Sequence, residues 1–453
     1  MAFYPAARED LRIGLYIKLS GNWFTHPFPT NSFKIKDQKD LATILALRNC
    51  KVLYDPDRSD PLPSEEVENG SVAAEVQVVG SPAIVQETSE SQDLPIVLSP
   101  YLDSPEKFQA NQARLQKLKE AEKSYQEVLK QNKDSIREIK AGYAKGVRKA
   151  ESLVNTLAKI LDENGTLISI LNFNTNQEMG DDFYYHSLNV CMLSMVLGQG
   201  LDLPDETIKM LGIGALFHDI GELEGAGMFI KKGTKMNKQE LQFLRNHPKN
   251  GRKMIGGFGF PEPSLEAIAQ HHERLNGSGY PDGLKENALH LLSKIVMVAD
   301  TYDELCNNPQ FEKSLTPHEA ICQIYAKRGA EFWEEAVIAL IQNLGVYPPS
   351  SIVELSNGSL GMVTSINLVD RMRPAIMLYN PDIPREDAII VDLYQQEPTL
   401  SLKQSLRPMD VPRKVWKYLN PRGMISYFAC NTGVSPTATP EATPAPQPSL
   451  APV

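Results

Sequence analysis

Five histidines and two aspartates form a series whose residue types suit metal binding. In chain order they are His186, His218, Asp219, His247, His271, His272 and Asp300. Imidazole and carboxylate are protein ligands suited to iron, manganese and zinc. A single histidine on a helix is usually an ordinary core or surface residue, and we interpret His26, His290 and His318 in that way. The ordered series instead predicts a metal site.

Apolar helical segments must carry these side chains. His218 and Asp219 end the apolar run LGIGALFHDIGE, and His271 and His272 follow EAIAQ. Asp300 lies within LHLLSKIVMVADTYDELC, whose apolar character predicts a buried helix. Burial of a carboxylate is costly unless a metal, a charge or hydrogen bonds compensate it. The helices are therefore expected to converge on bound cations.

The pattern along the chain predicts a mainly α fold. Residues 161–345 carry amphipathic helical patterns and almost no strand signal, which predicts an all-helical core. Strand patterns indicate a small α/β domain over residues 1–58 and a small β-rich unit over residues 346–430, with a hairpin turn at Asn357-Gly358. The compositions of residues 59–103 and 431–453 predict a flexible linker and a disordered tail.

Residues 104–160 form a strongly helical segment with few apolar residues and mixed charges. This pattern favours a long solvated helix or a helical pair that bridges domains. The segment could pair two chains in a homodimer, or it could be a simple spacer. The sequence leaves both alternatives open.

The bulk composition excludes several classes of protein. A net charge of −10 argues against a nucleic-acid binder, which needs a concentrated basic face. The five cysteines are scattered without a CxxC pair, as expected of free thiols in a reducing compartment. The chain shows no signal-peptide pattern and no uninterrupted apolar run of about 18 residues. We therefore expect a cytoplasmic protein.

The ordered series resembles that of the HD superfamily of metal-dependent phosphohydrolases. The segment HHERLNGSGYPDGL is very similar to the motif that names the HD-GYP branch, and YYHSLNV, NHPKNG and VADTYDEL are further matches. The first domain resembles a small accessory domain that precedes some bacterial HD-GYP domains, chiefly through Trp23, His26, Pro27 and Phe28. An HD-type helical bundle is the fold that the resemblance implies.

The resemblance also implies an activity and its residues. HD-GYP proteins hydrolyse cyclic-di-GMP to pGpG and onward to GMP with two or three metal ions, often iron, while manganese and zinc are alternatives. The seven residues of the series would be the ligands, with His218 and Asp219 as the catalytic pair and Asp219 bridging two ions. Asp182, one helical turn before His186, could hold a third ion, although Asp181 and Asp182 could equally cap the helix. The implied substrate contacts are Gly279, Tyr280, Pro281, Asp303 and Lys313.

Four residues depart from the family pattern. Glu222 stands where the family usually has a lysine, and Asn276 replaces an aspartate before the loop glycine. Pro309 and Glu312 occupy the places of a substrate-side arginine and lysine. Because a charge-assisted contact is worth about 1.5–3 kcal/mol, weaker binding of the cyclic dinucleotide is expected, with Lys313 as a partial substitute.

Three functions therefore remain open. The first is an active cyclic-di-GMP phosphodiesterase. The second is a catalytically weak HD-GYP signalling module that binds metal and acts through protein contacts, for which the long helix and the GYP loop offer surfaces. The third is hydrolysis of a different phosphoester.

Overall fold

In a computed structural model of the chain, the described residues are 4–6, 11–19, 32–35, 38, 41, 44–45, 52–59, 101, 104–162, 166–169, 182–224, 237–308, 310, 313–367, 369–420 and 425–430. They fall into two units, residues 1–93 and 94–453, and each is considered by itself. Within the described part, no helix has the length and apolar character needed to cross a bilayer.

The first unit contains a small antiparallel sheet with the strand order β1-β4-β2-β3. The strands are β1 (Tyr4–Pro5), β2 (Tyr16–Leu19), β3 (Ser32–Lys34) and β4 (Val52–Tyr54). β2 lies in the run LRIGLYIKL and β4 in NCKVLYD, which confirms that strands form within the predicted first domain. Ile17 and Ile35 are fully buried in its core. Trp23, His26, Pro27 and Phe28 lie outside the described residues, as do most of the predicted linker and all of the predicted tail.

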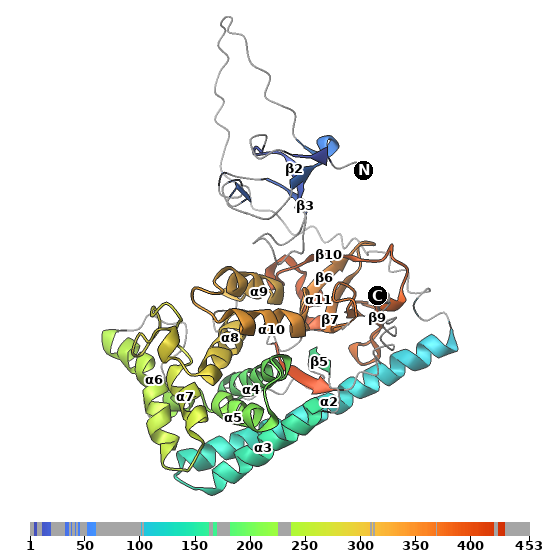
Figure 1. Cartoon of the computed structure of the whole chain (residues 1–453). Coiled ribbons are helices and arrows are strands. Elements are labelled where there is room, and N and C mark those ends of the chain that lie inside the picture. Colours follow the sequence, from blue (N-terminus) through green and yellow to red (C-terminus); the bar gives the residue numbers. More distant parts are fainter. Residues whose placement is uncertain are drawn as a thin grey trace, which may run out of the picture. The chain divides into compact units, whose positions relative to one another are not determined.

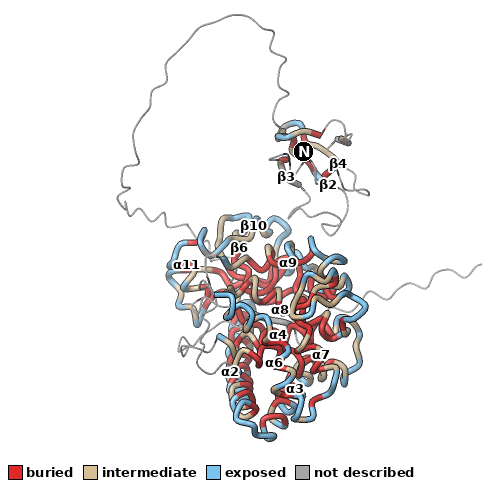
Figure 2. Tube along the Cα trace, turned by 90° about the vertical axis from the view of Figure 1, so that its left-hand side faces the viewer, coloured by how far each residue is buried: buried red, intermediate tan, exposed pale blue. Residues whose placement is uncertain are grey.

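A bundle of helices forms the core of the second unit, as the mainly α prediction requires (Figure 1). The central α4 has few charged residues and is buried along most of its length (Figure 2). It packs against α5, α8 and α10. The helices are α4 (Asp182–Gly200), α5 (Asp205–Leu216), η4 (Ile220–Glu224), α6 (Lys238–Gly256), α7 (Glu262–Gln270), α8 (Leu291–Cys306), α9 (Pro317–Ala326) and α10 (Glu334–Leu344).

The charged segment before the bundle is a helical pair, α2 (Pro105–Lys140) and α3 (Lys145–Asp162). The alternative of a long solvated helix is wrong, because α2 buries a stripe that includes Leu115, Tyr125 and Ile136. Sparse apolar residues suffice here because they recur on one face, and buried Asn132 adds a polar contact to α4. Pairing of two chains through this segment stays a prediction.

A sheet of seven strands completes the second unit. The hairpin predicted at Asn357-Gly358 is confirmed, with Gly358 at a φ of 85°. Against the expectation of a strand-free segment over residues 161–345, β5 belongs to this sheet, where it pairs with β11 and β7. The strands are β5 (Thr166–Ser169), β6 (Ile352–Leu355), β7 (Leu360–Ser365), β8 (Ala375–Leu378), β9 (Ile390–Asp392), β10 (Leu402–Ser405) and β11 (Tyr427–Cys430), and α11 (Arg413–Leu419) precedes the last.

Candidate metal centre

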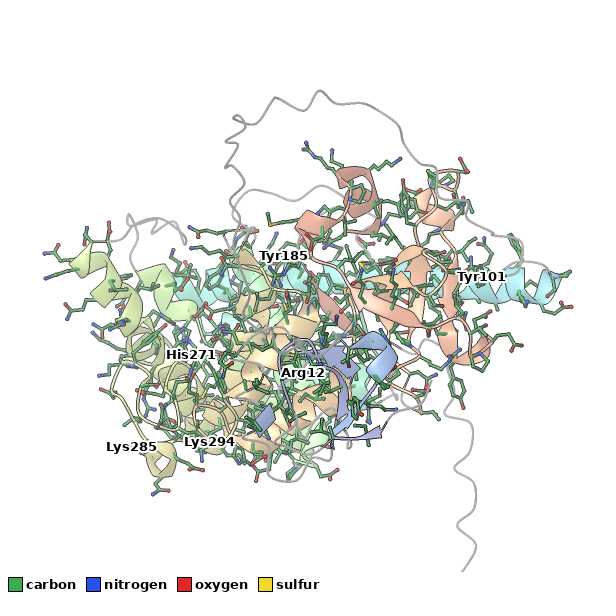
Figure 3. All side chains as sticks on the ribbon, turned by 90° about the horizontal axis from the view of Figure 1, so that it is seen from above. Arg12, Tyr101, Tyr185, His271, Lys285 and Lys294 are labelled. Carbon is green, nitrogen blue, oxygen red and sulfur yellow. The ribbon has the colours of Figure 1, made fainter. Side chains whose placement is uncertain are left out.

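The helical bundle brings together all seven residues of the predicted series. Figure 3 places His271 among the helices, well away from Tyr101 beside α2. Close approach of the helices is required, since a Cβ on Gly214 of α5 would lie 2.7 Å from that of Ala267 on α7. The seven residues come from α4 (His186), the turn after α5 (His218 and Asp219), α6 (His247), the end of α7 (His271 and His272) and α8 (Asp300).

One group of potential metal ligands consists of His186, His218 and Asp300. The Nε2 atoms of the two histidines are 3.1 Å apart. An oxygen of Asp300 lies 3.3 Å from Nε2 of His186 and 3.6 Å from Nε2 of His218. These three side chains could therefore hold one ion.

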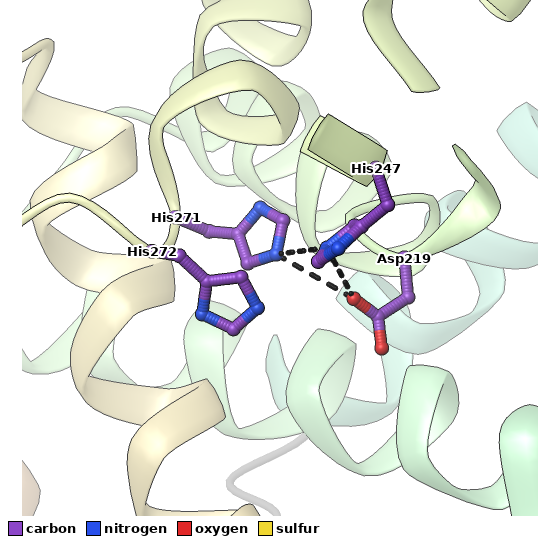
Figure 4. Close-up of side chains that lie close together, drawn as sticks. All are labelled: Asp219, His247, His271 and His272. Atoms are coloured by element: carbon purple, nitrogen blue, oxygen red, sulfur yellow. Dashed lines mark hydrogen bonds and ion pairs between the residues drawn. The ribbon is translucent and has the colours of Figure 1, made fainter. Parts of the chain in front are cut away.

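A second group consists of Asp219, His247, His271 and His272 (Figure 4). The Nε2 atoms of His247 and His271 are 3.0 Å apart, and Oδ1 of Asp219 lies 3.0 and 3.5 Å from them. The other oxygen of Asp219 faces the first group, 3.6 Å from Nε2 of both His186 and His218. The carboxylate of Asp219 thus lies between the two groups.

Backbone carbonyls fix how three of these imidazoles face the centre. The Nδ1 atoms of His218, His247 and His271 lie 2.7, 2.6 and 2.8 Å from the carbonyl oxygen three residues earlier. A carbonyl only accepts, so each Nδ1 carries a proton, and Nε2 is the nitrogen that each ring turns inward and can offer to a metal. Such backbone partners typically orient metal-binding histidines.

The sequence explains why those carbonyls are available. α5 ends at Leu216 and α7 at Gln270, so the carbonyls of Ala215 and Ile268 lie in final helical turns that lack regular partners. Within α6, Pro248 follows His247. The carbonyl of Leu244 would normally accept from the N–H at position 248, which proline lacks. Nδ1 of His247 donates to this carbonyl instead.

The chemistry of the donor set fits divalent metal ions. Both oxygens of Asp300 are buried and have no hydrogen-bond donor among the described residues. Burial raises the pKa of Asp300, but His186 and His218 hold that pKa well below its usual range. Burial lowers the pKa of His271 to about 4, so this imidazole is neutral at pH 7. Buried anionic oxygens that face converging imidazole nitrogens form a site that is able to bind a divalent cation.

The surroundings of Asp182 and Asp303 differ from the roles that the resemblance implied for them. Asp182 is exposed at the first turn of α4 and belongs to none of the potential ligand groups in the described part of the chain. Asp303, expected at the substrate, is fully buried and lies behind His186, with Oδ2 2.7 Å from its Nδ1. It supports a potential ligand and is too enclosed to contact substrate.

Glu304 is a further potential ligand that the sequence did not single out. It forms a third group with His272 and Asp300, with one ligand atom from each residue within 4.8 Å of the others. Glu304 follows Asp303 directly on α8. No spacing in the sequence distinguishes Glu304 from an ordinary solvent-exposed glutamate, and its neighbour Asp303 gives no such signal.

The GYP loop, which contains Gly279, Tyr280 and Pro281, lies beside the second group and is held there by hydrogen bonds and close packing. The rings of Tyr280 and His272 have centroids 4.6 Å apart. Buried Glu273 accepts hydrogen bonds from the backbone N–H groups of Asp282 and Leu284 at 2.8 and 2.9 Å. A Cβ on Gly279 would overlap the backbone of Glu273, so this position requires glycine. Sequence reasoning gave Glu273 no role, although it directly follows the histidine doublet.

The departures from the family pattern differ in their consequences. Asn276 accepts from the N–H of Ser278 at 2.9 Å, a bond that an aspartate would also make. Burial lowers and Asp219 raises the pKa of His247, and Glu222 adds to the net rise. Glu222 therefore places negative charge near the centre. Pro309 and Glu312 lie outside the described residues, and Lys313 is exposed.

A family model described as "HD domain" matches residues 155–335. The chain carries an HD domain. This confirms the resemblance to the HD superfamily and the helical fold that it implied. HD-domain phosphohydrolases are metal-dependent, and the buried cluster of the present HD domain is able to bind metal. A second model, "Domain of unknown function (DUF3391)", matches residues 7–150 and thus includes the first sheet and α2.

Several characterised proteins are similar to this chain. "Cyclic di-GMP phosphodiesterase PA4108" of Pseudomonas aeruginosa is 26% identical over 82% of this chain and 83% of its own length. The response regulator RpfG of Xanthomonas campestris, also named a cyclic di-GMP phosphodiesterase, is 31% identical over 32% of this chain and 39% of its own. "3'3'-cGAMP-specific phosphodiesterase 1" of Vibrio cholerae is 32% identical over 30% of this chain and 32% of its own length.

A solved structure described as an HDG"Y"P protein, Bd1817 from Bdellovibrio bacteriovorus, covers 73% of this chain and 94% of its own at 15% identity, with a TM-score of 0.41.

Proposed function

We propose that this protein hydrolyses cyclic-di-GMP to pGpG and onward to GMP at a metal pair in its HD domain. The relative similar over 82% of the chain is named for cyclic di-GMP phosphodiesterase activity. The observation that carries the proposal is the position of Asp219, whose oxygens lie 3.0 Å from Nε2 of His247 and 3.6 Å from that of His186. One carboxylate can thereby serve two adjacent ions.

The proposed roles follow from the two ligand groups. His186, His218 and Asp300 would hold one ion and His247, His271 and His272 the other, with Asp219 between them. We propose iron, with manganese able to replace it, because nitrogen and oxygen donors suit both. A bound metal pair supplies polarisation of the phosphodiester and lowers the pKa of a water.

The residues of the GYP loop are proposed to contact the substrate. Tyr280 stands beside His272, and burial raises the pKa of its phenol well above the usual value. The phenol therefore keeps its proton and can donate a hydrogen bond to a phosphate or a base. Gly279 and Pro281 set the path of the loop around it, and Lys313 remains a proposed contact with the phosphates.

The test combines elemental analysis with a product assay on one preparation. Protein purified without oxygen should contain about two ions of iron or manganese per chain and convert cyclic-di-GMP to pGpG or GMP. The Asp219→Asn variant should lose metal and turnover together. Metal-free wild-type protein, or metal-loaded protein without turnover in iron, manganese and zinc, would contradict the proposal.

A second candidate is a metal-binding signalling module with weak catalysis. Glu222 favours it, since this residue adds negative charge near His247 where the family usually has a lysine. The product assay separates the candidates, because a signalling module would contain metal and turn over slowly. Assays with 3'3'-cGAMP and other cyclic dinucleotides test whether a different phosphoester is the preferred substrate.

A further inference from the structure

Three hydrogen-bonding groups converge on the buried carboxylate of Asp303. Its Oδ2 lies 2.7 Å from Nδ1 of His186. Its Oδ1 accepts from Nδ2 of Asn189 and from Nδ2 of Asn307, both at 2.9 Å. Asp303 is 0% exposed, so its orientation depends on these neighbours and not on water. Since His186 lies at the metal centre, whatever holds Asp303 also holds a proposed ligand.

The same two asparagines hold the backbone of Ile425, which leads into β11. Asn189 and Asn307 each donate from Nδ2 to the carbonyl of Ile425 at 2.9 Å. The N–H of Ile425 donates to Oδ1 of Asn307 at 2.7 Å. Asn307 thus pairs with both backbone groups of Ile425. The phenol oxygens of Tyr302 and Tyr427 lie 3.2 Å apart, which adds a second polar contact between α8 and β11.

The hydrogen bond from the N–H of Ile425 fixes the orientation of the Asn307 amide. A backbone N–H can only donate, so the oxygen of the amide must face Ile425. The NH2 group must then face Asp303, where it donates to the carboxylate. Without Ile425 the amide could rotate and turn its oxygen toward Asp303, where two acceptors would repel each other.

We infer that Asn307 is a positioning residue through which the segment at Ile425 orients Asp303 and, through it, His186. The inference rests on the proposed metal centre and goes beyond it, because it makes the segment that leads into β11 of the seven-stranded sheet a part of that centre's support. Hydrogen-bond partners of metal-binding histidines commonly change metal affinity by about 10–100-fold when removed. Withdrawal of Ile425 should therefore weaken metal binding without touching a ligand.

The test measures the dissociation constant for Mn²⁺ by chelator competition in the full chain. Asn307→Ala should raise that constant by about tenfold or more. The control is Asn343→Ala, since Asn343 also uses its amide to bond a backbone carbonyl, that of Ala339 at 2.8 Å, but on α10. Asn307→Ser serves the same purpose if the alanine variant does not fold.

A double-mutant cycle separates positioning from general destabilisation. If Asn307 acts through Asp303, adding Asn307→Ala to Asp303→Asn should change the Mn²⁺ constant by less than about twofold. Independent, multiplying effects would overturn the inference, as would an Asn307→Ala constant equal to that of the control. Metal-free wild-type protein would overturn the proposed function instead.

A further measurement needs no bound metal and therefore tests the inference even if the wild-type protein is metal-free. The Nδ1 proton of His186, followed by NMR in metal-free protein, should exchange with solvent about tenfold faster or more in Asn307→Ala than in Asn343→Ala. Equal exchange rates in the two variants would overturn the inference whatever the metal content.

Discussion

At the scale of single residues, the metal centre depends on which nitrogen of each imidazole carries the proton. Carbonyls three residues earlier hold the Nδ1 protons of His218, His247 and His271. The rings therefore enter the centre with Nε2 already directed inward. The convergence of these residues could be predicted from sequence because their residue types and order are unusual.

Pro248 provides a direct test of this arrangement. Pro248→Ala should restore an N–H to α6 that competes with His247 for the carbonyl of Leu244. We expect the free energy of unfolding to rise by up to about 3 kcal/mol, because proline inside a helix costs about that much. Affinity for Mn²⁺ should nevertheless fall several-fold. Thermal unfolding and chelator competition measure the two effects, and a parallel rise in both would contradict the role of proline.

Metal binding should weaken as the pH falls. Without metal, burial lowers the pKa of His186, but Asp300 and Asp303 raise it further, to well above 6.5. A raised pKa means that the ring keeps its proton at neutral pH, so a metal must displace that proton. The Mn²⁺ dissociation constant should therefore rise from pH 8 to pH 6, with proton release on binding by calorimetry. A constant independent of pH in this range would be the contrary result.

Glu222 tests the effect of local charge on the substrate. Glu222→Lys removes a negative charge near His247 and supplies a cation for the phosphates. One charge-assisted contact worth about 1.5–3 kcal/mol corresponds to roughly a 10- to 100-fold gain in kcat/KM for cyclic-di-GMP. Glu224→Lys, a nearby exposed position, is the matched control. Equal effects of the two variants would indicate only a long-range change in net charge.

At the scale of elements, close backbone approach sets the position of α6. A Cβ on Gly221 would overlap the carbonyl of His247, so η4 and α6 can touch only with glycine there. Gly221→Ala should cost about 3 kcal/mol or more of unfolding free energy and reduce metal content. Gly256→Ala, at the end of α6 with no neighbour within 4 Å, should change stability by less than about 1 kcal/mol. Chemical denaturation compares them, and similar losses in both would refute a specific contact.

The support around the centre was largely beyond prediction from sequence. Asp303, Asn307 and Glu273 act through partners that only the folded chain brings near them, and their residue types are common at surfaces. β5 was missed for a similar reason. Its four residues TLIS carry no strand pattern of their own, and their pairing with β11 comes from the far end of the described chain. The helices carrying the ligands were predictable because their apolar patterns are local.

At the scale of the whole molecule, the second unit holds every residue of the centre and its hydrogen-bonded support. Residues 94–453 should therefore fold and bind metal without the first unit. We expect the fragment to unfold cooperatively and to match the full chain in metal content within about 20%, measured by circular dichroism and elemental analysis. An aggregated fragment, or a folded one without metal, would show that the first unit is required.

The link between Asn307 and Ile425 has a consequence for biosynthesis. Ile425 lies 118 residues after Asn307 in the chain. A ribosome that has already translated all seven residues of the centre must still translate β6 to β10 and α11 before the amide of Asn307 acquires the partner that orients it. Ions captured by the nascent chain before that point would meet an unfinished site, so tight metal binding should follow the synthesis and folding of the segment at Ile425.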